Sequence, residues 1–163
     1  LALSRAEHGR RLLQRAAVNV AFLVDTLIQP LASRIAEARL TIAREMAADG
    51  VVTTDPMLFE SIVANLIENA ATYAVPDSRV EIGFKRSGGD FELRVANAAP
   101  DLLSADLPRM FDRFWRKDRA RTGGNHAGLG LALSRSFAET LGLKLEAALE
   151  PNNVLVMTLR GPG

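Results

Sequence analysis

The stretch that decides the fold is SIVANLIENAATYA, residues 61–74, which follows Asp55-Pro56. An aspartate before a proline is a typical helix start, because its carboxylate caps free N–H groups and proline suits the first helical position. Pro76 predicts that the helix ends by about Tyr73. One broad face of this helix is apolar and predicts packing against a core. Its members are Leu58, Phe59, Ile62, Val63, Leu66 and Ala70.

Two asparagines lie along the edge of that apolar face. Asn65 and Asn69 are four residues apart and Tyr73 follows four later, so all three project from one side of the helix. Asparagine is a poor helix former, and an unpaired carboxamide at a core edge costs about 1–3 kcal/mol. Each amide could cap a loop or bond a neighbouring strand. Alternatively, the pair supplies neutral oxygen ligands for Mg2+, which usually takes one or two protein oxygens beside water and phosphates.

Patterns elsewhere in the chain predict further helices. The charged residues 1–15 read as a helical end, and helical periodicity covers residues 18–37, where Pro30 should introduce a kink or a break. A third helix should cover residues 129–141 and end at Gly142.

Alternating or short apolar runs predict the strands of a sheet, two of them joined by SGGD as a hairpin. These runs cover residues 39–46, 50–55, 79–86, 90–97, 143–149 and 154–160. Residues 98–127 should be mostly irregular, interrupted by the apolar-aromatic piece LPRMFDRFW. Helices combined with a mostly antiparallel sheet predict an α+β fold, a two-layer sandwich with the helices on one face of a mixed sheet.

The bulk composition excludes several classes of protein. With 163 residues, 48% hydrophobic and 24% charged, the chain suits one globular domain with its own core. A net charge of +1 gives no reason to expect nucleic acid or an anionic membrane surface as a partner. No cysteine is present, and no apolar run approaches the roughly 20 residues of a membrane span. Since the chain begins at Leu1 without a methionine, we expect it to be part of a longer protein.

The stretch RTGGNHAGLGLALSR, residues 121–135, places Gly128 and Gly130 where a helix should start. Free backbone amides and the helix dipole favour anions there. This is neither a Walker loop, since no Gly-Lys-Ser/Thr follows, nor a dinucleotide fingerprint, so the glycines alone predict only a helix start. A basic run just upstream adds the charge that a polyphosphate requires. It comprises Arg113, Arg116, Lys117, Arg119 and Arg121. Stacking of Phe114 and Trp115 on single-stranded nucleic acid is disfavoured by the balanced charge of the chain.

Three separated pieces share an order with a known family: NLIENA at 65–70, MFDRFWR at 110–116 and HAGLGLALS at 126–134. They resemble the N box, F box and second glycine box of the ATP-binding catalytic domain of bacterial sensor histidine kinases, within the gyrase, chaperone, kinase and MutL ATPase superfamily. The resemblance implies a Bergerat-type ATP-binding fold, with ATP as substrate and Mg2+ as cofactor. It divides the chain into residues 1–16, the end of a dimerisation and phosphoacceptor helix, and residues 17–163, the catalytic domain.

The resemblance also implies roles for individual residues. Asn69 and Asn65 would hold Mg2+. Phe111 and Phe114 would anchor one end of a lid over the nucleotide, and Gly123-Gly124 would form the mobile, hinge-like part of that lid. The ATP-binding residues it implies are Asn65, Asn69, Tyr73, Asn97, Arg116, Lys117, Gly128, Leu129, Gly130 and Leu131.

The chain departs from the family pattern at NAAPD, residues 97–101. The family has Asp-x-Gly-x-Gly here, and its aspartate receives the adenine amine. Asn97 replaces that aspartate, while Ala99 and Asp101 replace the glycines. Thr72 stands where the family often has a lysine. These departures leave open how well this chain holds adenine.

The function implied is that of a protein-histidine kinase, which hands the γ-phosphate of Mg-ATP to a histidine on an upstream helical domain. Its partners would be that dimerisation domain, in a homodimer, and a response regulator. The chain would be a cytoplasmic domain of an inner-membrane sensor, with no contact to nucleic acid and none to membrane except through upstream regions. Neither His8 nor His126 is expected to act: His8 does not lie in a phosphoacceptor box, and His126 borders the lid. The catalytic acid or base would belong to the upstream domain, so none is expected in this chain.

Two other functions remain open. The altered NAAPD loop could belong to a degenerate nucleotide-binding or regulatory module with weak or no kinase activity. The chain could also be a free-standing anti-sigma-factor kinase of the same superfamily, although the F box and the helical N-terminal pattern argue against it.

Overall fold

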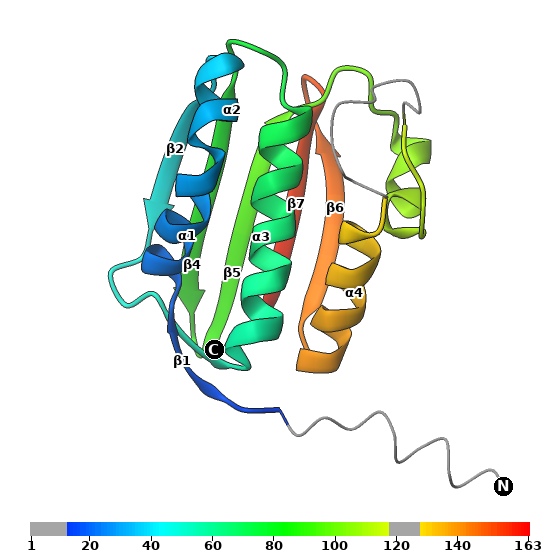
Figure 1. The fold of residues 1–163 in the computed structure, drawn as a ribbon. Coiled ribbons are helices and arrows are strands. Elements are labelled where there is room, and N and C mark those ends of the chain that lie inside the picture. Colours follow the sequence, from blue (N-terminus) through cyan, green and yellow to red (C-terminus); the bar gives the residue numbers. More distant parts are fainter. Residues whose placement is uncertain (1–12, 118–127) are drawn as a thin grey trace, which may run out of the picture.

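The computed structural model describes residues 13–117 and 128–163, in which a layer of helices covers a five-stranded sheet (Figure 1). Most of the helical end predicted at residues 1–15, and the predicted hinge at Gly123-Gly124, lie outside these residues; residues 13–15 are not helical. The elements in chain order are β1 (Ala16–Asn19), α1 (Val20–Ile28), a 3-10 helix (Gln29–Leu31), α2 (Ala32–Glu37), β2 (Thr41–Met46), β3 (Val51–Thr54), α3 (Pro56–Tyr73), β4 (Arg79–Ser87), β5 (Asp90–Ala98), a second 3-10 helix (Ser104–Phe111), α4 (Gly130–Leu141), β6 (Lys144–Glu150) and β7 (Val154–Pro162).

Five strands form one mixed sheet in the order β2-β4-β5-β7-β6. β2 runs parallel to β4, and every other neighbouring pair is antiparallel. Helices α1, α3 and α4 lie on the same face of this sheet (Figure 1). The predicted two-layer α+β sandwich with a mostly antiparallel sheet is therefore confirmed.

The core lies between α3 and the sheet. The ring of Phe59 on α3 meets Phe91 of β5 edge-on, with 5.9 Å between the ring centroids. Residues of β4 alternate between buried and exposed along the strand, as expected when one sheet face is covered. The side chains that α3 buries are Phe59, Ile62, Val63, Leu66, Ile67, Ala70 and Ala71.

The ends of α3 are those predicted from its sequence. The carboxylate of Asp55 accepts a hydrogen bond from the backbone N–H of Leu58 at 3.2 Å, which caps the first turn. Pro56 occupies the first helical position, and the helix ends at Tyr73, before Pro76. This helix is positioned by its own sequence as well as by the core.

The N-terminal elements differ from the prediction in one respect. Residues 18 and 19 are not helical, because they pair with β3 as part of β1, in a separate two-stranded antiparallel sheet. The helix starts at Val20, where the Asn19 side chain accepts from the N–H of Phe22 at 3.0 Å. Pro30 then breaks the helix as predicted, leaving a 3-10 turn between α1 and α2.

Two further boundaries shift slightly. The apolar-aromatic piece begins earlier than its sequence indicates, as the 3-10 helix Ser104–Phe111. α4 begins at Gly130 and ends at Leu141, and Gly142 caps it with a φ of 73°, which suits glycine. Within residues 13–117 and 128–163, the length and apolar character that a helix needs to cross a membrane are not found.

Candidate functional site

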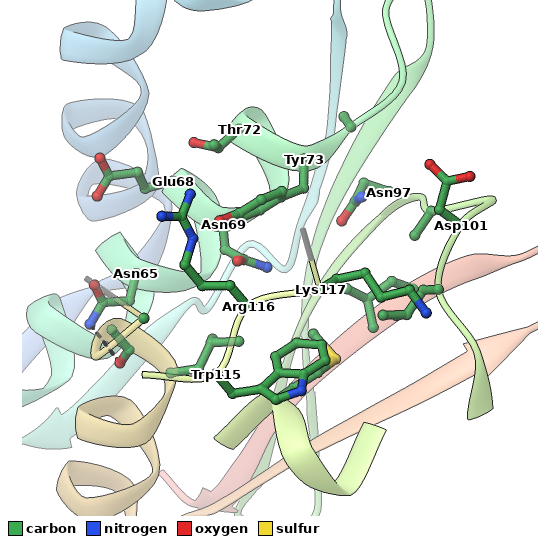
Figure 2. Close-up of a pocket in the computed structure, with 18 of the residues that line it drawn as sticks. Asn65, Glu68, Asn69, Thr72, Tyr73, Asn97, Asp101, Trp115, Arg116 and Lys117 are labelled. Atoms are coloured by element: carbon green, nitrogen blue, oxygen red, sulfur yellow. Dashed lines mark hydrogen bonds between the residues drawn. The ribbon is translucent and has the colours of Figure 1, made fainter. Parts of the chain in front are cut away.

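A pocket of about 750 Å3 opens above the C-terminal half of α3, walled by the end of β5, the start of α4 and residues 115–117 (Figure 2). Figure 2 shows Asn97 and Asp101 on one side of the pocket, Asn65 and Glu68 on the other, and Asn69 and Tyr73 between them. All ten residues predicted to bind ATP line it: Asn65, Asn69, Tyr73, Asn97, Arg116, Lys117, Gly128, Leu129, Gly130 and Leu131. Their contact with a nucleotide stays a prediction.

Asn65 joins α3 to the first turn of α4. Its Nδ2 donates to the carbonyl oxygen of Gly130 at 3.2 Å and to Oγ of the buried Ser134 at 3.0 Å. The Ser134 hydroxyl donates in turn to the same carbonyl at 2.9 Å. A Cβ at position 130 would lie 3.1 Å from Asn65 Oδ1, so glycine permits the close approach of the two helices. Asn65 thus fixes the α4 N-terminus at the edge of the pocket.

Asn69 lies one turn further along α3 and is half-buried. No hydrogen bond joins its side chain to another residue in the described part of the chain, so its carboxamide is available to a ligand. Across that same part, no group of three or more His, Asp or Glu side chains could hold a metal ion. A single amide oxygen beside phosphates and water fits Mg2+, and Asn69 suits this role better than Asn65, whose amide is engaged with α4.

Asn97 lies near the end of β5, in register with Val80 of β4 and Leu155 of β7. Its side chain is buried, with 3% exposed, and faces the pocket. The Nδ2 group donates to the carbonyl oxygen of Ala98 at 3.0 Å, which leaves Oδ1 as an acceptor for a ligand.

The rest of the NAAPD loop is held by the turn between β6 and β7. The N–H of Ala99 donates to the carbonyl oxygen of Asn153 at 2.8 Å, and Asn153 Nδ2 donates to that of Pro100 at 3.4 Å. Ala99, Pro100 and Asp101 all line the pocket. The positions where the family has glycine therefore face the same cavity as Asn97.

Arg116 and Lys117 bring positive charge to the pocket from the opposite wall to α3 (Figure 2). The Lys117 amine bonds the carboxylate of Asp106, which also accepts from the N–H of Leu103 at 2.9 Å. The bond from Lys117, and then that from Leu103, hold the pKa of Asp106 below its usual range. Asp106 is thus ionised at neutral pH and competes with an incoming phosphate for Lys117.

The two chain segments that border residues 118–127 meet at Phe114 and Gly128. The N–H of Phe114 donates to the carbonyl oxygen of Gly128 at 2.9 Å. Gly128 has a φ of 68°, and a Cβ there would lie 2.9 Å from the oxygen of Trp115 and 3.0 Å from the Cα of Phe114. Only glycine fits this junction without a shift of the backbone.

The F-box phenylalanines behave differently from each other. Phe111 packs against the core, and the guanidinium of Arg135 lies 4.9 Å from its ring centroid. The side chain of Phe114 is 67% exposed, so the expectation that it anchors this segment is wrong for the side chain. Its backbone N–H makes the contact with Gly128 instead, from a residue with a positive φ of 65°.

Sequence analysis missed several residues of the pocket wall. Glu68 and Thr72 follow Asn65 at helical spacing, and that spacing alone would have placed them on the same side of α3. Ala74, Val75 and Pro76 follow α3 directly in the chain, and Met110 and Trp115 belong to the F-box piece, but no role in binding was predicted for them. Leu102 and Leu155 come from distant parts of the chain, where no local pattern predicts a place in the pocket wall.

Comparisons with known proteins agree with this fold and pocket. The probable sensor protein PcoS of Escherichia coli is 31% identical over 159 residues, which cover 95% of this chain but 33% of PcoS. The chain thus spans about a third of that relative's length.

Solved structures show the same fold at low identity. The catalytic domain of histidine kinase ThkA superposes with a TM-score of 0.79 at 18% identity, covering 91% of this chain and 95% of that one. ThkA in complex with the response regulator protein TrrA gives a TM-score of 0.77 at 19% identity, covering 99% of this chain and 48% of the other. Residues 54–162 match the family model of the histidine kinase-, DNA gyrase B-, and HSP90-like ATPases, and the chain belongs to this family.

Proposed function

We propose that this chain is the catalytic domain of a two-component sensor histidine kinase, which binds Mg-ATP and donates its γ-phosphate to a histidine outside this chain. The observation that carries the proposal is the convergence on one pocket of segments that bear the N box, the F box, the second glycine box and Asn97. Family membership and similarity to a sensor protein support the same function.

The two sides of the pocket suit the two ends of ATP. On one side, Oδ1 of Asn97 would accept from the adenine amine, and the exposed edge of Tyr73 would lie beside the base. On the other side, Asn69 would hold Mg2+, which neutralises phosphate charge and orients the triphosphate. Arg116, Lys117 and the N-terminal amides of α4 would bind the phosphate oxygens.

Phosphoryl transfer requires little covalent chemistry from the residues of this domain. A nitrogen of the acceptor imidazole would form a bond to the γ-phosphorus while the bond to the bridging oxygen breaks, and ADP leaves. Such a transition state needs positioning and charge neutralisation, which the pocket residues supply. We assign no catalytic acid or base to the described residues, since the acceptor histidine belongs to an upstream helical domain.

The same proposal gives the chain its partners. The acceptor helix would come from a homodimeric dimerisation domain, and a response regulator would take the phosphate onward. The structural likeness to ThkA in its complex with TrrA supports the second partner. In this arrangement the chain is a cytoplasmic part of a sensor anchored in the inner membrane by upstream regions.

Calorimetric titration with Mg-ATP tests the proposal. We expect saturable binding of Mg-ATP and Mg-ADP and no comparable binding of Mg-GTP, because the Asn97 acceptor matches the amine of adenine. Incubation with γ-labelled ATP should leave no acid-labile label on this chain, which lacks a phosphoacceptor box. Absence of Mg-ATP binding at millimolar concentration would refute the proposal, and label on His8 or His126 would refute the external acceptor.

A degenerate regulatory module is the second candidate, and a specific observation favours it. Ala99 and Asp101 put a methyl group and a carboxylate on the pocket wall where the family has glycines. Both add bulk near Asn97 and restrict the approach of a base. If nucleotides fail to bind while the domain is folded, this second function takes precedence.

A further inference from the structure

Arg34 on α2 reaches the outer side of the pocket wall. Its Nη1 donates to Oγ1 of Thr72 at 2.7 Å and lies 3.9 Å from Oε1 of Glu68. The side chains of Arg34 and Glu68 are 39% and 40% exposed, so water reaches this ion pair without surrounding it. The α2 helix that carries Arg34 packs directly against α3.

Both partners of Arg34 line the pocket. Glu68 and Thr72 are one helical turn apart on α3, and Asn69 lies between them in sequence and in the same wall. Arg34 itself is behind this wall rather than in the lining. Among the described residues, the hydrogen bond and ion pair that connect it to the pocket wall are those with Thr72 and Glu68.

Glu68 places a negatively charged side chain in the wall of a pocket that is proposed to bind a negatively charged polyphosphate. A carboxylate on the phosphate side repels a triphosphate, and the repulsion is appreciable at the effective dielectric of a protein surface. Arg34 places a positive charge next to that carboxylate from behind the pocket wall, in addition to the side chain of Arg116, which lies beside Glu68 on the pocket side (Figure 2). The bond from Arg34 to Thr72 holds its guanidinium in that position, because a hydrogen bond at 2.7 Å restricts the long arginine side chain.

We propose that Arg34 is a positioning residue of the nucleotide site, which neutralises Glu68 and holds the Glu68–Thr72 edge of α3 for the phosphate groups. This inference rests on the proposed function, since it presumes that a polyphosphate enters the pocket. Its effect should grow with the charge of the ligand. A purely structural role would change the affinity for every ligand alike.

Calorimetric titration of the whole chain with Mg-ATP, Mg-ADP and adenosine tests this, using Arg34→Gln and Arg34→Lys. We expect Arg34→Gln to weaken Mg-ATP binding about three- to five-fold, the scale of a partly exposed ion pair, and adenosine binding not at all. Arg34→Lys should retain most of the Mg-ATP affinity, because it keeps the charge.

Arg160→Gln is the matched control. Arg160 is 49% exposed and pairs with Glu92 and Glu146 at 3.6 Å each, and none of these three residues lines the pocket. It removes the same charge from the chain, so equal weakening of Mg-ATP binding by both variants would show a general charge effect and overturn the inference.

A double variant separates compensation of Glu68 from a direct effect of Arg34 on phosphate. If Arg34 acts by neutralising Glu68, Arg34→Gln should change Mg-ATP affinity less than two-fold in a Glu68→Gln background. An undiminished effect there, or equal weakening for ATP and adenosine, would overturn the inference. Failure of the wild type to bind any nucleotide would refute the proposed function itself, whereas Mg-ATP binding unaffected by Arg34→Gln would refute this inference alone.

Discussion

Replacing Gly128 with alanine should reduce the free energy of Mg-ATP binding more than it reduces the free energy of unfolding. Alanine at a φ of 68° costs about 1 kcal/mol, and its Cβ would lie 2.9–3.0 Å from backbone atoms of Trp115 and Phe114. Crowding of this kind typically adds about 1–3 kcal/mol. The chain can relieve the contact by opening the Phe114–Gly128 junction, which is outside the core. Because Gly128 and the residues that follow Phe114, Trp115 to Lys117, line the pocket, we expect at least a ten-fold loss of Mg-ATP affinity, or about 1.4 kcal/mol.

Gly142→Ala provides the matched control for this prediction. Gly142 has a similar φ of 73°, but a Cβ there would meet nothing within 4 Å. It should lower the melting temperature by about 2–4 °C, the shift expected from 1 kcal/mol in a domain of this size, and leave Mg-ATP affinity unchanged. Calorimetric titration and thermal unfolding of both variants give the two quantities. If Gly128→Ala binds Mg-ATP as tightly as Gly142→Ala does, the reasoning about the junction is wrong.

Three further predictions concern single side chains. Asn69→Ala should remove most of the Mg2+-dependent gain in ATP affinity without changing the fold, and equal affinity with and without Mg2+ in the wild type would contradict it. Asn97→Leu should nearly abolish ATP binding in the same titration. Asn97→Asp should keep the ATP affinity or improve it by up to about 1 kcal/mol, because a charged acceptor makes a stronger hydrogen bond. The pKa of Asp106 is lowered, so its bond to Lys117 stabilises the fold fully at neutral pH and loses that effect as pH falls below about 4. The difference in unfolding free energy between wild type and Asp106→Asn should therefore be constant above pH 6 and vanish in acid; a constant difference down to pH 2 would contradict this.

Much of the fold could be predicted because its signals are local. Asp55-Pro56 and Pro76 bound α3, and alternation within 79–98 marks the hairpin of β4 and β5. β1 could not be predicted, since its four residues are mostly exposed and show no alternation. It is a strand because it pairs with β3, more than thirty residues away.

The same distinction explains which parts of the site were found. The ten residues predicted to bind ATP were identified from the family pattern, and all of them line the pocket. Leu102 and Leu155 lie in the wall through long-range packing, and no pattern in the neighbouring sequence predicts this. Arg34 lies on a six-residue helix and has no pattern in its neighbouring sequence that would predict a role. Its hydrogen bond to Thr72 forms only when α2 packs against α3.

α3 has one face buried against the core and another that lines the pocket, and this division has an evolutionary consequence. The residues that anchor the helix, such as Phe59 and Leu66, are separate from those that face the pocket, such as Asn69 and Tyr73. Apart from Asn65, which also holds the start of α4, the residues on the pocket-lining face can therefore change with little effect on folding. A lineage can lose catalysis in a few steps and keep an intact scaffold, so inactive descendants that retain this architecture should arise readily. Among such inactive descendants, we expect the first substitutions on the pocket-lining face of α3.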